Sequence, residues 1–208
     1  MTTVLLIHGG LWEEMNAERF WHRPGIVAGL QRHGVEVLAP TRLRRARSWA
    51  SEAQHLTTLL PDHPVTVVAG SNGCSAAIRL VRTLGLTEPD RFDRLLLAWP
   101  ATAGDAQVDA RTRLGLAELG AEPDVLDALL AGRTLRGTTD DELASITMPV
   151  GVLGSVPENP YHQRRTVDAL LRILPSATEL PGCPEPPHPA FPSHADSLVR
   201  TVADFALT

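Results

Sequence analysis

A serine stands among small residues at the point where an apolar run gives way to a helical pattern. The segment Ala69–Gly73 reads AGSNG and directly follows the β-branched run that starts at Val65. Small neighbours let the chain turn sharply from strand to helix, and such a turn holds the serine hydroxyl out at the end of the strand. This pattern predicts Ser71 as a nucleophile for acyl transfer, although a purely structural glycine turn would look similar. Ser75, a rival one helical turn later, should lie inside the helix.

A glycine pair follows the first apolar run of the chain, Val4 to Ile7. Glycines at the end of a strand expose backbone N–H groups, and an oxyanion needs two such donors. We expect one donor to be the N–H of Gly10, with that of Leu11 as the other choice. The second should be the N–H of Asn72, the residue after the nucleophile. His8 then organises the loop and does not act as the base.

A nucleophilic serine needs a base, and the chain has eight histidines. His188 lies in a proline-rich loop between the last apolar run and the last helical pattern. Prolines stiffen a loop, and a rigid loop at the end of a strand is a suitable mount for a catalytic imidazole. We therefore predict His188 as the general base. His162 and His194 stand at or near helix starts, and the histidines expected at the surface are His22, His33, His55 and His63.

An acidic residue should orient the imidazole and stabilise its charged form. Glu158 is the carboxylate in the loop Gly154 to Pro160, and the chain order serine, acid, histidine favours it. Asp105, which follows an earlier apolar run, is the rival. Glu158 could instead cap the helix that begins near Tyr161.

Short apolar runs alternate with helical patterns along the chain. Near-continuous apolar runs separated by helices are typical of a parallel sheet that is covered on both faces. We therefore predict an α/β fold with a mostly parallel six-stranded sheet flanked by helices. The six expected strands are 4–7, 35–39, 65–69, 95–99, 150–153 and 177–180, and the five expected helices are 25–33, 48–60, 72–84, 163–174 and 193–206.

One segment, 101–145, interrupts this alternation. It has no convincing strand pattern, and its short helical patterns cover Arg111 to Leu119 and Asp124 to Leu130. Insertions of this size between strands are often functional. We predict a helical lid at 101–145 within a single domain, 1–208.

These features together resemble the α/β-hydrolase family. The resemblance covers nearly the whole chain and rests on the segment Leu6 to Gly10, on the serine turn, on Gly154 to Pro160, and on His188 before the final helix. It departs from the family pattern at Ala69, where the motif has glycine, and at Glu158, where aspartate is commoner. The resemblance implies a trimmed hydrolase fold, without the first two strands of the full family, that catalyses acyl transfer to water.

Composition excludes several other classes. The chain of 208 residues is 43% apolar and 21% charged with a net charge of -5, so it lacks the basic surplus that nucleic-acid binding needs. No apolar run is long enough to span a membrane, no signal peptide is evident, and the expected location is the cytoplasm. No sign of a cofactor or metal is present, and the oligomeric state stays open. The arginine cluster is expected on a solvated face or at an anionic partner: Arg42, Arg44, Arg45 and Arg47.

Aromatic and aliphatic residues near the expected site indicate the substrate. Leu11, Trp12 and Trp99 stand near the ends of elements that face it, and they line either an apolar substrate pocket or simply the core. We predict a serine hydrolase that cleaves an ester, lactone or thioester of a small, largely apolar molecule. The alternatives are a lyase or isomerase that uses the same serine and histidine, and a non-catalytic binding module on this scaffold.

Overall fold

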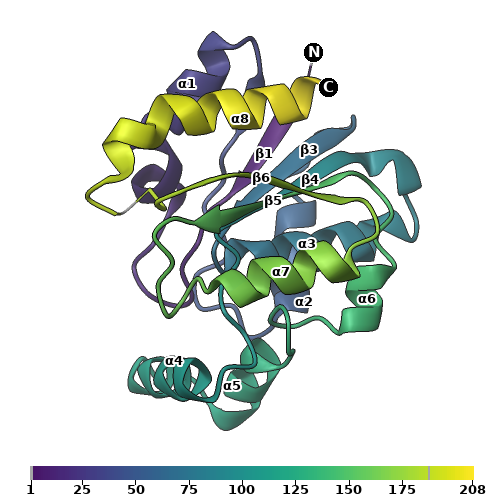
Figure 1. Cartoon of the computed structure of the whole chain (residues 1–208). Helices are drawn as coiled ribbons and strands as arrows, with labels where there is room; N and C mark the ends of the chain where they lie inside the picture. The colour runs from purple at the N-terminus through teal and green to yellow at the C-terminus, as the bar shows by residue number, and fades with distance from the viewer. Residues whose placement is uncertain (1, 187) are drawn as a thin grey trace.

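The protein is described by a computed structural model that covers residues 2–186 and 188–208. Its centre is one sheet of six parallel strands in the order β2-β1-β3-β4-β5-β6 (Figure 1). The six predicted strands are all confirmed. Their bounds are β1 Thr3–Ile7, β2 Glu36–Leu38, β3 Val65–Gly70, β4 Phe92–Ala98, β5 Val150–Ser155 and β6 Ala177–Cys183.

Helices cover both faces of the sheet, as the near-continuous apolar strands require. Successive residues of a strand point to opposite faces, so Leu5 and Val67 pack in one buried cluster while Leu6 and Val68 pack in the other. Figure 1 shows α1 (Ile26–Arg32) and α8 (Ala195–Leu207) on one face. The opposite face carries α2 (Trp49–Thr57), α3 (Gly73–Gly85) and α7 (Arg164–Ile173). The five predicted flanking helices are therefore confirmed.

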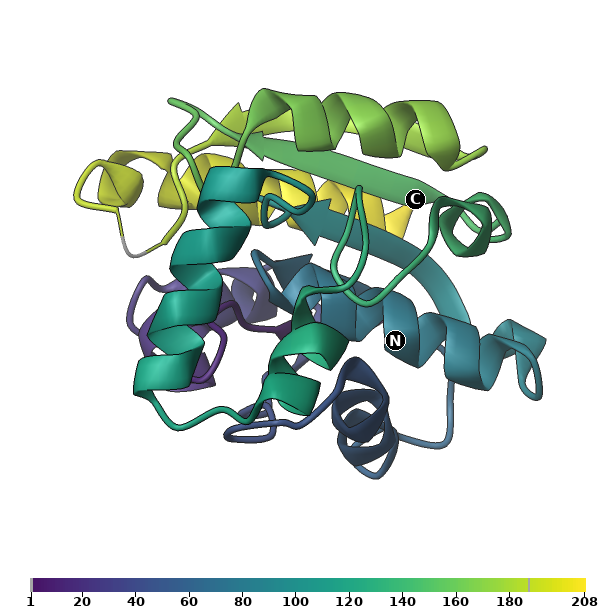
Figure 2. The ribbon, with the colours of Figure 1, turned by 90° about the horizontal axis from the view of Figure 1, so that it is seen from below.

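The segment between β4 and β5 is helical, and its first two helices lie side by side, apart from the sheet and from its third helix (Figures 1 and 2). It forms α4 (Ala106–Glu118), α5 (Pro123–Leu130) and α6 (Asp140–Ala144). Helix α4 begins earlier than the pattern predicted, because the side chain of Asp105 accepts hydrogen bonds from the N–H groups of Gln107 and Val108. Within the described residues, no helix has the length and apolar character to cross a membrane.

Candidate functional site

Ser71 occupies the tight turn that joins β3 to α3. Its φ angle is 54°, in the left-handed region that non-glycine residues rarely adopt. The turn is fixed from one side, where the N–H of Ser71 donates to the carbonyl of Ala98 on the neighbouring strand at 2.9 Å. Backbone conformations of this kind persist only where the surroundings determine them, and they cluster at functional sites.

Glycine at position 73 lets this turn approach the first strand closely. A Cβ at Gly73 would lie 2.6 Å from the carbonyl oxygen of His8 and 2.7 Å from that of Ile7. Both obstacles are backbone atoms, so they could not move aside cheaply. The glycine therefore brings the start of α3 against the loop that follows β1, and the two expected oxyanion donors belong to these adjoining segments.

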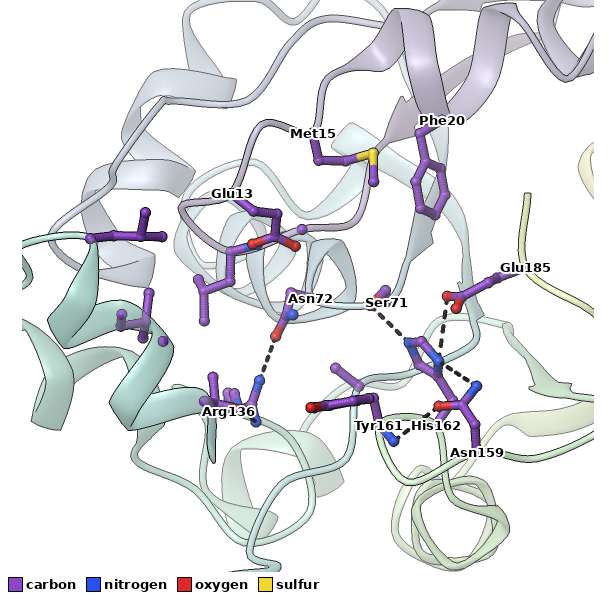
Figure 3. Close-up of a pocket in the computed structure, with 17 residues that line it drawn as sticks. Glu13, Met15, Phe20, Ser71, Asn72, Arg136, Asn159, Tyr161, His162 and Glu185 are labelled. Carbon is purple, nitrogen blue, oxygen red and sulfur yellow. Dashed lines mark hydrogen bonds and ion pairs between the residues drawn. The ribbon is translucent and has the colours of Figure 1, made fainter. Parts of the chain in front are cut away.

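The structure brings His162 to Ser71, as Figure 3 shows. Nε2 of His162 lies 2.9 Å from the Ser71 hydroxyl oxygen. On the far side of the ring, Nδ1 lies 3.4 Å from a carboxylate oxygen of Glu185 and 3.3 Å from the amide nitrogen of Asn159. His162 comes from the loop after β5 and Glu185 from the loop after β6. A serine, an imidazole and a carboxylate thus stand in line.

Burial sets the protonation states of His162 and Glu185. His162 is 7% exposed, and its burial, together with the nearby charge of Arg136, lowers the pKa of the imidazole to about 4. Burial raises the pKa of the Glu185 carboxyl to about 7. The imidazole is therefore neutral at pH 7 and able to accept a proton, while the carboxyl changes charge close to neutral pH.

The histidine and acid predicted from the sequence lie elsewhere. His188 is exposed, and its Nδ1 accepts a hydrogen bond from the N–H of Ala190. Glu158 is also exposed and accepts from the N–H of Arg164 at the start of α7, which is the capping role considered as its alternative. Asp105 caps α4 and pairs with Arg165 at 3.0 Å. The expectation that His188 and Glu158 adjoin Ser71 is wrong.

The two loops were identified correctly, but the residue types were exchanged between them. The loop after β5 was expected to carry the acid and carries the histidine, whereas the proline-rich loop after β6 was expected to carry the histidine and carries Glu185. The predicted chain order of serine, acid and histidine does not hold, because here the histidine precedes the acid. A triad is defined by its geometry, so the signal for this site is a histidine in the loop after β5, His162, together with a carboxylate in the loop after β6, Glu185.

The loop after β1 is held by Arg42. Its Nη1 donates to the carbonyl oxygens of His8 at 2.9 Å, Gly9 at 3.3 Å and Gly10 at 2.9 Å. Its backbone N–H donates to Nε2 of His8, so the proton of that ring is on Nδ1, which donates to the Gly9 carbonyl at 2.7 Å. His8 therefore organises the loop, and its burial lowers its pKa to about 4.

This arrangement sets the direction of the N–H of Gly10. The C=O and N–H of a trans peptide point in opposite directions. With the carbonyl of Gly9 bound on the Arg42 side, the N–H of Gly10 points the other way, and Gly10 lines the cavity beside Ser71. The N–H of Leu11, the other choice of donor, is bound by the carboxylate of Glu13. Asn72 is the N-cap residue of α3, at the end of the helix where N–H groups have no acceptor within the helix.

Arg42 was expected on a solvated face with the rest of its cluster, and this expectation is wrong. Its side chain is 5% exposed and forms two hydrogen bonds, 2.8 and 2.7 Å long, with the carboxylate of Glu52, which is 1% exposed. Arg44 and Arg47 do lie in solvent, with side chains 75% and 65% exposed. The buried pair explains why one arginine of the cluster differs from the others.

Replacing Arg42 by alanine should lower the free energy of unfolding by about 3–5 kcal/mol, because it leaves Glu52 as an unpaired buried charge. Urea denaturation of the purified variant measures this loss. Arg44→Ala is the matched control, since Arg44 forms an exposed ion pair with Glu14 at 3.7 Å, and its effect should stay within about 0.5 kcal/mol. Equal midpoints for the two variants would contradict the role given to Arg42.

A cavity of about 460 Å³ opens at Ser71. Leu11 lines it, as predicted from the sequence. Trp12 does not: its indole N–H donates to the carbonyl of Ala46, and it lines a neighbouring hollow. Trp99 is fully buried and donates to the carbonyl of Cys183, so its assignment to the substrate pocket is wrong and its role is packing. The apolar lining consists of Gly10, Leu11, Met15, Phe20, Ala101, Gly115, Leu116 and Leu119.

Polar groups stand on two sides of this cavity (Figure 3). Arg136, which is 2% exposed, donates to the side-chain oxygen of Asn72 at 2.8 Å and pairs with Asp109 of α4 at 3.3 Å. It thereby connects the serine turn to the helical insertion. Among residues 2–186 and 188–208, no group of three or more His, Cys, Asp or Glu side chains is arranged to hold a metal ion.

No protein-family model and no curated protein matches the sequence. Solved structures do match the fold. A meta-cleavage product hydrolase from Pseudomonas fluorescens is 16% identical with a TM-score of 0.70, over 99% of this chain and 90% of that one. A serine hydrolase from Cycloclasticus zankles is 16% identical with a TM-score of 0.69, over 99% and 89%. An enzyme that degrades N-acyl homoserine lactones is 16% identical with a TM-score of 0.63, over 96% and 92%.

These similarities define the class of fold. The parallel sheet, its helices on both faces and the serine turn after β3 are those of the α/β-hydrolase fold, and this chain adopts that fold.

Proposed function

We propose that the protein is a serine hydrolase that cleaves a small, largely apolar ester, lactone or thioester through an acyl-enzyme on Ser71. The observation that carries the proposal is the line of side chains Ser71, His162 and Glu185, with Nε2 of His162 2.9 Å from the serine oxygen. A hydroxyl beside a neutral imidazole that is itself oriented by a carboxylate is an activated nucleophile.

The reaction follows from this geometry. The Ser71 hydroxyl attacks the substrate carbonyl carbon while His162 accepts its proton at Nε2. The N–H groups of Gly10 and Asn72 stabilise the negative oxygen of the tetrahedral intermediate. The charged imidazole is stabilised by Glu185 and then donates its proton to the leaving group. A water molecule, activated by the same imidazole, attacks the acyl carbon and frees the serine.

Two observations favour a hydrolase over a binding module on the same scaffold. A module that had lost catalysis would have no reason to keep a serine, a histidine and a carboxylate converging in one cavity. The serine also retains its left-handed backbone, with a φ of 54°, which costs free energy in the folded state. Three proteins of this fold with similar structures are hydrolases or degrade lactones by their names, which agrees with the proposal.

The apolar lining of the cavity favours an apolar substrate group. Leu116 of α4 and Leu119, the residue directly after α4, contribute to that lining, so the segment 101–145 is the lid of the site in this proposal. A set of p-nitrophenyl esters, a lactone and a thioester tests the activity. We expect release of the alcohol or thiol from at least one class. A well-folded protein that turns over none of them would contradict hydrolysis and favour a lyase or a binding module.

The pH dependence of kcat/KM should follow the ionisation of the Glu185 carboxyl. The reactive form has a neutral His162 and an ionised Glu185. Because the pKa of Glu185 is raised to about 7, acidification through pH 7 protonates the pair and removes the partner of the imidazole. We expect kcat/KM to rise with pH with a midpoint near 7, measured on the best ester. With His162 alone in control, whose pKa is about 4, the rise would come at much lower pH.

Two glutamate variants separate the candidate acids. Glu185→Gln removes the group that titrates near pH 7, so the rise in kcat/KM should move to lower pH and its plateau should fall. Glu158→Gln is the matched control, because Glu158 is exposed at the start of α7, and it should keep the original profile. The same midpoint in Glu185→Gln as in the unaltered protein would contradict the assignment of Glu185.

A further inference from the structure

One face of α4 lines the cavity at Ser71. Its contributors are Thr112, Gly115, Leu116 and Leu119, which are spaced three or four residues apart and therefore lie on one side of the helix. The opposing apolar wall includes Leu11, from the loop after β1. Leu11 and Leu116 belong to the same buried cluster, so the cavity reaches from the serine to an apolar floor.

Gly115 is anomalous on this face. Glycine inside a helix destabilises that helix relative to alanine, and it usually persists because the backbone needs a positive φ or a close approach. Gly115 has neither, since it lies within regular helix and a Cβ there would meet no atom within 4 Å. Gly73 shows the opposite case, where a Cβ would collide with backbone. The missing side chain at 115 leaves space open and serves no packing purpose.

We infer that the α4 face is a subsite for a flexible apolar group of the substrate, such as an acyl chain of several carbons, and that Gly115 sets how long that group can be. This inference rests on the proposed function and adds the substrate class. A side chain at 115 would project from the cavity-lining face into the open space beside Leu116. Glycine at position 115 makes α4 less stable than alanine would, and it leaves space in the cavity for the substrate.

Substitution at position 115 tests the inference through chain-length preference. The measurement is kcat/KM for p-nitrophenyl acetate and p-nitrophenyl octanoate with the unaltered protein, Gly115→Ala and Gly115→Leu. We expect Gly115→Leu to lower the octanoate-to-acetate ratio of kcat/KM by about tenfold or more, because the new side chain would occupy the space of several methylene groups of the longer acyl chain. Gly115→Ala should shift the preference less, and its melting temperature should rise.

The matched control is Ala117→Leu, on the exposed side of the same helix. It should leave the octanoate-to-acetate ratio unchanged. An unchanged ratio in Gly115→Leu would overturn the inference while leaving hydrolysis intact. If the unaltered protein hydrolyses neither ester, calorimetric binding of octanamide and acetamide replaces the kinetics. If Gly115→Leu binds octanamide more weakly than the unaltered protein but binds acetamide equally well, the subsite is supported even without hydrolase activity. If the two proteins bind octanamide equally well, the inference is overturned.

Discussion

Replacing His162 by alanine should lower kcat on the best ester substrate by about 10³–10⁶-fold, with the protein still folded. The imidazole accepts the proton of Ser71 at a distance of 2.9 Å, and the contacts of the described residues show no other base at that hydroxyl. Steady-state kinetics measure the loss. The rate that remains should reflect the backbone donors and substrate binding alone.

His188→Ala is the matched control for this variant. His188 is exposed, and its side chain accepts a hydrogen bond from the backbone N–H of Ala190, so its removal should change kcat by less than about threefold. Together, the two variants show whether His162, as in the structure, or His188, as predicted from the sequence, is the general base. A large loss in His188→Ala with a small one in His162→Ala would show that the loop after β6 supplies the base.

Replacing Ser71 by alanine should remove turnover by a similar factor, about 10³–10⁶-fold, because no acyl-enzyme can then form. Combining it with His162→Ala should bring little further loss, since residues of a triad act as a unit. Steady-state rates of the two single variants and the double variant measure this. Additive losses would indicate that the serine and the histidine act independently.

Ser75→Ala is the control for the serine. Ser75 is fully buried in α3, and its hydroxyl has no hydrogen-bond partner in the part of the chain that the structure describes. Removing such a hydroxyl leaves no donor or acceptor behind, so folding and activity should both be kept. Loss of activity in Ser75→Ala and not in Ser71→Ala would overturn the choice of nucleophile.

The fold was predictable because its signals are local. Apolar runs such as Val65 to Ala69 and helical patterns such as 72–84 show their own periodicity, and alternation of the two dictates a parallel sheet. The serine turn was also visible, since small residues on both sides of Ser71 mark it. The strand ends then showed which loops border the site, and both loops do contribute to it.

The identity of the side chains in those loops could not be predicted in the same way. Whether His162 or His188 faces the serine depends on how each loop folds back, and irregular loops carry no periodic pattern. Arg42 is a similar case, because a cluster of arginines looks solvated until Glu52, on another element, comes to pair with it. Trp99 looked like a pocket residue because its position at the end of β4 was known, whereas the direction of its ring was not.

Activation of Ser71 by His162 is tested most directly by the rate and position of labelling with a fluorophosphonate, followed by intact mass and peptide mapping. We expect one adduct per chain on Ser71, formed at the normal rate in His188→Ala. Labelling should be at least about 10²-fold slower in His162→Ala and absent in Ser71→Ala. An adduct that persists in Ser71→Ala, or labelling of His162→Ala at the unaltered rate, would contradict the activation of Ser71 by His162.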